Sequence, residues 1–161
     1  MRGGALPPAL LAAALGFLLA FAPRKAIGPA LVLFLVAALI AGNVRTGPGV
    51  LDMVFYGCWA SVIVTALSIH VPRLTGRIPA IVLAANAGLW AGAVIAATGH
   101  PPDLAKALPW ALLCLPGTWL VSRRMGLGIK VVASWLIAVA ILAAVLPTTT
   151  ATPGYAPDHM E

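Results

Sequence analysis

Six stretches of this chain consist mainly of apolar residues, and short polar stretches rich in Gly, Pro and Arg separate them. A helix needs about 20 apolar residues to cross a hydrocarbon core of about 30 Å. Runs near that length predict six membrane-spanning helices, over residues 5–22, 26–42, 50–70, 78–98, 104–122 and 129–146. The runs lack the alternation of barrel strands, so they favour helices, which pair their backbone groups internally.

The predicted fold class is an all-α, polytopic transmembrane bundle of about six helices arranged as three hairpins. Residues 1–147 form one transmembrane domain, and residues 148–161, rich in Thr and Pro, form a disordered C-terminal tail. The fifth segment is the weakest, because Pro116 and Gly117 interrupt it and Lys106 must extend its amine outward to water. The similar heptapeptides at 5–11 and 107–113 indicate either an internal repeat or chance in an Ala- and Leu-rich chain.

Composition agrees with this assignment. Hydrophobic residues make up 61% of the chain, charged residues make up 9%, and the mean hydropathy is +1.03. These values lie outside the range of soluble globular domains. The lipid bilayer is therefore the expected surroundings, and the abundance of Ala, Gly and Pro favours the plasma (inner) membrane of a bacterium.

Positive charge is distributed unequally between the two sides of the predicted bundle. The loops at 23–25, 71–77 and 123–130 fall on one side and carry seven of the ten cationic residues: Arg24, Lys25, Arg73, Arg77, Arg123, Arg124 and Lys130. The positive-inside rule makes this side cytoplasmic, so both termini are expected outside the cytoplasm. The net charge of +6 then belongs at anionic headgroups, and no nucleic-acid partner is needed to explain it.

The first apolar segment has the basic start and the A-x-A ending, at residues 20–22, of a secretory signal peptide. Pro23 would directly follow the cleaved bond, which is a poor context because proline restricts the backbone on both sides. Cleavage would also place the cation-rich loops outside. We therefore expect the segment to remain as the first helix.

Candidate catalytic chemistry is sparse. No ionisable residue falls in the middle third of a predicted span, where proton-driven transporters usually carry one. Cys58 and Cys114 occupy different helices without a C-x-x-C motif, so packing is their expected role. Asp52 and Asp103 open helices, where a carboxylate complements the helix dipole. His70 closes a helix as an interfacial residue, with pH sensing as the alternative. No catalytic residues are predicted.

Possible metal ligands gather only near chain ends and loops. Asp158, His159 and Glu161 lie in the predicted tail, and His100 is close to Asp103. Two or three potential ligands on a flexible segment do not make a defined metal site. We therefore expect neither a metal nor a cofactor.

Small residues form the clearest spatial pattern. The helix predicted over 78–98 carries them at steps of four: Ala80, Ala84, Gly88, Gly92 and Ala96. The helix predicted over 50–70 carries Gly57, Ser61 and Thr65 at the same spacing. Such stripes let two backbones approach closely, so they predict that these two helices pack through them. Asn86 lies about 200° around the helix from Gly88 and faces another helix or a cavity, which would make this helix central.

Two functions are compatible with these features. The first is an accessory or structural subunit of a larger membrane complex, with other membrane subunits or further copies of the chain as partners. The alternative is a small transporter, or a transporter's membrane subunit, for an uncharged or weakly polar solute. A cavity lined by Asn86, Ser61, Thr65 and Thr118 would favour the transporter, whereas a dry core would favour the subunit.

Overall fold

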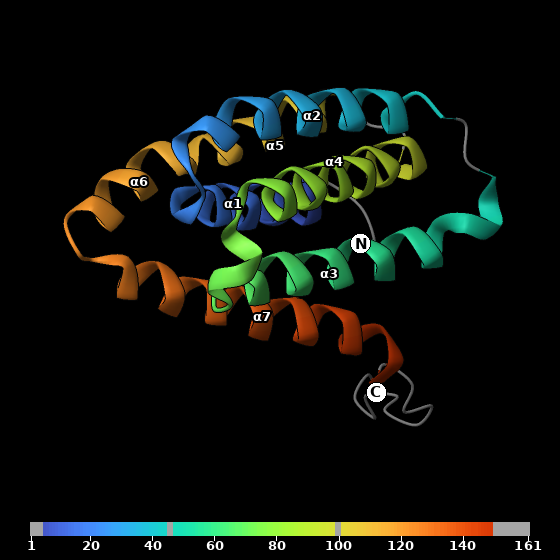
Figure 1. The fold of residues 1–161 in the computed structure, drawn as a ribbon. Helices are drawn as coiled ribbons and strands as arrows, with labels where there is room; N and C mark the ends of the chain where they lie inside the picture. The colour runs from blue at the N-terminus through green and yellow to red at the C-terminus, as the bar shows by residue number, and fades with distance from the viewer. Residues whose placement is uncertain (1–4, 45–46, 99–100, 150–161) are drawn as a thin grey trace.

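A computed structural model describes residues 5–44, 47–98 and 101–149 of the chain (Figure 1). This part is all α-helical, with three short 3₁₀ segments and no strand. In chain order the elements are α1 (Leu6–Phe21), α2 (Arg24–Gly42), η1 (Pro48–Val50), α3 (Leu51–Ser68), η2 (Pro72–Thr75), α4 (Arg77–Thr98), α5 (Pro101–Ala107), η3 (Leu108–Leu113), α6 (Cys114–Ser122) and α7 (Gly126–Thr149).

These elements form a bundle that runs back and forth between two ends (Figure 1), in which α2 packs mainly against α4. Five spans are long and apolar enough to cross a membrane, and α1 is a shorter apolar helix of 16 residues. The prediction of an all-α polytopic bundle is confirmed, and the chain is a multi-pass membrane protein by helix length and hydropathy.

The most deeply buried helix is α1. Leu11, Leu15, Leu18 and Leu19 are all fully buried, and α1 packs against α3, α4, η3 and α6. The expectation that the helix over 78–98 is the central one needs correction, because α4 leaves Val82 and other residues of one face exposed. Five alanines and Gly16 lie among the leucines of α1, so neighbouring helices can approach it from several sides.

The fifth predicted span is broken, but not at the expected place. Pro116 and Gly117 lie inside the continuous helix α6, and the backbone instead changes to a 3₁₀-helix over Leu108–Leu113. Pro116 occupies the first turn of α6, where its missing N–H is not needed for an intrahelical hydrogen bond. Pro109 lies between α5 and α6, where a continuous α-helix would need an N–H, and the chain winds more tightly around it.

The other predicted boundaries shift by a few residues. Helix α2 begins at Arg24, directly after Pro23, and α7 begins at Gly126. Residues 148 and 149 complete α7, and the rest of the predicted tail lies outside the described residues. The turn between α6 and α7 places Arg124 in the left-handed region, with φ of 61°.

Candidate functional site

Two polar side chains join α3 and α4 inside the bundle. The Asn86 amide nitrogen donates a hydrogen bond to Ser61 Oγ over 2.6 Å. One turn along each antiparallel helix, the Trp90 ring lies directly over Gly57, where a Cβ atom would collide with it. The polar stripe of α3 therefore faces α4, and it meets the side of α4 that carries Asn86.

The glycines of α4 face a different helix. A Cβ atom on Gly88 would collide with the Phe34 carbonyl oxygen and lie 2.8 Å from Ala37 Cβ, and both of these belong to α2. Gly92 meets α2 in the same way, one turn further along. The prediction that this stripe packs against the helix over 50–70 is therefore wrong. Its partner is α2, which runs parallel to α4 (Figure 1).

Sequence reasoning overlooked the matching stripe on α2. Small residues on α2 lie against the α4 glycines: Ala37, Ala38, Ala41 and Gly42. Every helix of this chain is rich in alanine, so this stripe did not stand out from its surroundings. Helical spacing nevertheless separated the two faces of α4 correctly, because Asn86 and Gly88 do point to different helices.

A second close approach was also overlooked, between α1 and the broken span. A Cβ atom on Gly16 would lie 2.9 Å from the Ala111 carbonyl oxygen and 3.2 Å from the Cys114 nitrogen. Gly117 similarly packs against Ala20. The signal in the sequence was the small residue at every fourth position of the first segment, through Gly16 and Ala20.

Two buried polar atoms have no hydrogen-bond partner within the described part of the chain. They are the Thr65 hydroxyl oxygen and the Trp59 indole nitrogen, both on α3. Thr65 is fully buried one turn from Ser61. Its hydroxyl does not join the pair formed by Asn86 and Ser61.

Within the described residues, the four polar side chains expected to line a transporter's cavity do not come together, because α6 packs against α1, α7 and η3 rather than against α3 and α4. Thr118 lies on α6 and donates its hydroxyl hydrogen bond to the carbonyl oxygen of Leu115 on its own helix. Asn86 and Ser61 are engaged with each other on α3 and α4. Thr118 therefore lies apart from the contact between α3 and α4.

The remaining candidate residues lie near the ends of helices. Asp52 lies in the first turn of α3, and Asp103 lies in the first turn of α5. The Asp103 carboxylate forms an ion pair with Lys106, with 3.1 Å between Oδ1 and Nζ. His70 follows α3, and its Nε2 lies 3.3 Å from Ser134 Oγ of α7. Cys58 and Cys114 are both buried and unpaired. Among residues 5–44, 47–98 and 101–149, no three potential ligands cluster as a metal site would require.

Several candidates from the sequence fall outside the described residues: His100, Asp158, His159 and Glu161, together with the cations Arg2 and Arg45.

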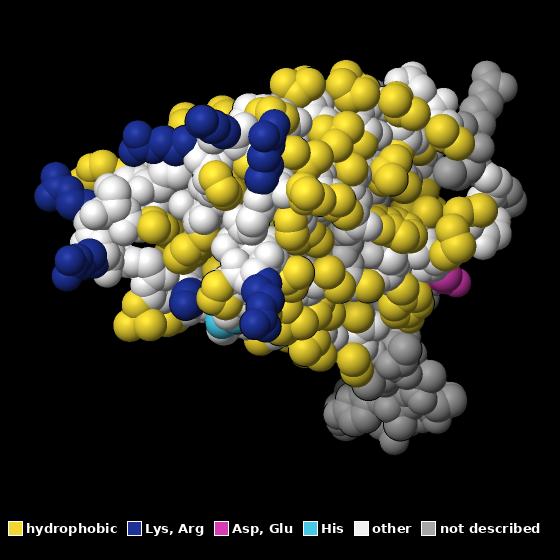
Figure 2. All heavy atoms as spheres, in the orientation of Figure 1, with side chains coloured by type: hydrophobic (Ala, Val, Ile, Leu, Met, Phe, Trp, Pro, Cys, Tyr) yellow, Lys and Arg dark blue, Asp and Glu magenta, His cyan; other side chains and the backbone are white. Residues whose placement is uncertain are grey.

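Most of the described cations lie toward one end of the molecule. Figure 2 shows Lys and Arg side chains gathered at the end where α1, α3 and α6 finish. By the bounds of the elements, the cations at or shortly after these three helix ends are Arg24, Lys25, Arg73, Arg77, Arg123, Arg124 and Lys130. Arg123 lies over the Trp119 ring at 5.1 Å from its centroid, an arrangement suited to a membrane interface.

Comparison with protein-family models, with curated proteins and with solved structures finds no match to this chain.

Proposed function

We propose that this protein is an accessory or structural subunit of a larger membrane complex. The observation that supports this most is the use made of its intramembrane polar groups. Asn86 and Ser61 bond to each other across a helix contact, and glycines bring α2 and α4 together without an aqueous gap. A chain built in this way offers outward helix faces to a partner.

The separation of charge supports an orientation for this subunit. With the cation-rich end in the cytoplasm, both termini lie outside, and the plasma (inner) membrane of a bacterium is the proposed location. A single cysteine at exposed Leu74, in η2, should react with an impermeant thiol reagent only after cell lysis, whereas one at exposed Gly49, in η1, should react in intact cells. The reverse pattern would refute the orientation. Buried Cys58 and Cys114 should stay unlabelled in both samples.

The subunit proposal is tested by photo-cross-linking in the native membrane. A photoreactive amino acid replaces Leu39, exposed on α2, or Leu142, exposed on α7, and replaces buried Leu15 as a matched control. At least one exposed position should yield a discrete adduct with another membrane protein or a second copy, and Leu15 should yield none. Adducts with lipid alone at both exposed positions would contradict the proposal.

The 3₁₀ break in the fifth span favours a small transporter as the second candidate. Non-α backbone within a span is tolerated where it is buried in protein or lines a cavity, and interrupted helices are frequent at transporter binding sites. Purified protein in liposomes would then move a small, weakly polar solute, and Gly16→Ala, which presses on η3, should reduce the flux.

A further inference from the structure

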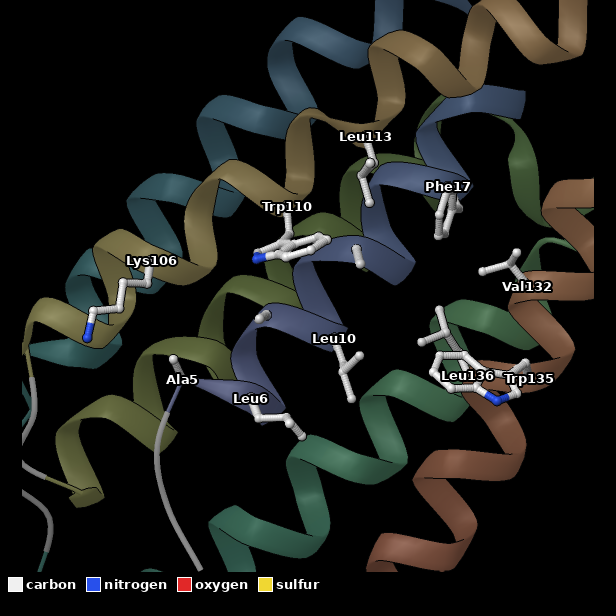
Figure 3. Close-up of a pocket in the computed structure, with 12 residues that line it drawn as sticks. Ala5, Leu6, Leu10, Phe17, Lys106, Trp110, Leu113, Val132, Trp135 and Leu136 are labelled. Carbon is white, nitrogen blue, oxygen red and sulfur yellow. The ribbon is translucent and has the colours of Figure 1, made fainter.

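A groove of about 510 Å³ runs along α1 between η3 and α7 (Figure 3). Leu6, Leu10 and Phe17 of α1 form its floor, Trp110 and Leu113 line one side, and Trp135 lines the other. Figure 3 shows the side chains of the two walls facing the space between them. Apart from Lys106, the residues that line the groove are apolar.

The 3₁₀ winding of η3 creates this wall. Residues three apart eclipse one another in a 3₁₀-helix, so Trp110 and Leu113 project in one direction. The other two rows of η3, Leu108 with Ala111 and Pro109 with Leu112, line a second groove of about 430 Å³ toward α2. The break in the fifth span thus separates two apolar grooves.

The first groove has the length and the volume to hold a thin hydrocarbon chain. Its floor extends from Ala5 to Phe17, which is about 18 Å at about 1.5 Å per residue. Its volume is about 510 Å³ and its lining is apolar along this length, so an extended acyl chain can lie in it.

One end of the groove carries hydrogen-bond donors. Lys106 lies at this end, and the indole nitrogen of Trp110 is on the side of its ring nearer to Lys106 (Figure 3). The Lys106 amine contacts Asp103 at 3.1 Å, and its side chain is 69% exposed, so its three donors are not all used. Lys106 is about 6 Å inside the start of its span at Pro102, which suits a side chain that reaches the headgroup level.

We propose that this groove binds one acyl chain of a phospholipid, with the phosphate held by Lys106 and Trp110. The apolar floor and walls accommodate the acyl chain, and the Lys106 amine and the Trp110 indole N–H donate hydrogen bonds to the phosphate oxygens. The second groove has similar volume but no cation among its lining residues, so we expect it to show no preference for the headgroup.

Native mass spectrometry of the purified protein tests the proposal. Wild-type protein in mild detergent should retain one phospholipid, and Ala9→Phe, which fills the first groove, should lower the bound fraction at least fivefold. Ala105→Phe, which fills the second groove, is the matched control and should retain the lipid. Absence of bound phospholipid from wild type, or equal loss in both variants, would overturn the proposal.

The headgroup contact is tested separately on delipidated protein. Phospholipid should raise the thermal midpoint of wild type more than diacylglycerol with the same acyl chains, and Lys106→Gln should abolish that difference. Equal effects of both lipids on wild type would refute a phosphate site at Lys106. This comparison needs only folded wild type to decide the question, so it remains decisive if Ala9→Phe fails to fold. Cross-linked dimers joined through the groove, with no bound lipid, would also overturn the proposal.

Discussion

The substitution Gly88→Ala adds only one methyl group, but it should destabilise the bundle more than the small size of a methyl group suggests. The new Cβ atom would collide with the Phe34 carbonyl oxygen, and it would lie 2.8 Å from Ala37 Cβ and 3.1 Å from the Ala38 nitrogen. Two of these three atoms belong to the α2 backbone and the third is attached to it directly, so no side-chain rotation relieves the contact. Gly88→Ala must push α2 and α4 apart.

The size of the effect follows from that displacement. Ordinary van der Waals contact begins at 3.4 Å, so the contact with Ala37 alone requires a shift of about 0.6 Å. A gap of about 0.5–1 Å forfeits a quarter to a half of each dispersion contact along the seam. Overpacking of a core costs about 1–3 kcal/mol, and contacts with backbone place Gly88→Ala near 3 kcal/mol.

Gly128→Ala on α7 is the matched control. A Cβ atom on Gly128 meets nothing within 4 Å, and the next residue is Ile129 rather than a proline, so this change adds the same methyl group without a clash. Alanine in a helix is more favourable than glycine by about 0.5–1 kcal/mol, so the control should be neutral or stabilising. Reversible unfolding in mixed micelles of mild detergent and SDS, followed by tryptophan fluorescence, gives both free energies. Equal stability of the two variants would refute the close α2–α4 packing.

Three further changes test individual contacts by the same unfolding measurement. In a double-mutant cycle, Asn86→Ala and Ser61→Ala should show a coupling of about 0.6 kcal/mol, and no coupling would mean that the hydrogen bond does not form. Thr65→Val should stabilise the protein by about 1 kcal/mol because it removes an unpaired buried hydroxyl, whereas a loss of stability would indicate a polar partner for Thr65. Arg124→Gly should stabilise by about 0.5–1 kcal/mol, since glycine adopts positive φ without strain. Arg123→Gly removes the same charge at a φ of −84° and should destabilise, so a gain from both would assign the effect to charge instead.

The sequence by itself determined the surroundings of this protein and its all-α, multi-pass organisation. Both depend on local quantities, namely the apolar length of each segment and the position of the polar breaks between them. The opposite orientations of Asn86 and Gly88 on α4 were also accessible, because helical periodicity fixes the angle between two positions whatever surrounds the helix.

Only the tertiary structure decided which helix meets which face. A stripe of small residues indicates that another helix can approach closely, but it does not specify which one. Several helices here carry such a stripe, and the stripe of α4 packs against α2 rather than against α3, which precedes it in the chain. The position of the break in the fifth span was likewise decided by tertiary contacts. Pro109 and Pro116 are both compatible with a break, and the chain breaks at Pro109, where the backbone of η3 lies against Gly16. Partners of this kind depend on contacts between distant segments, which no local pattern specifies.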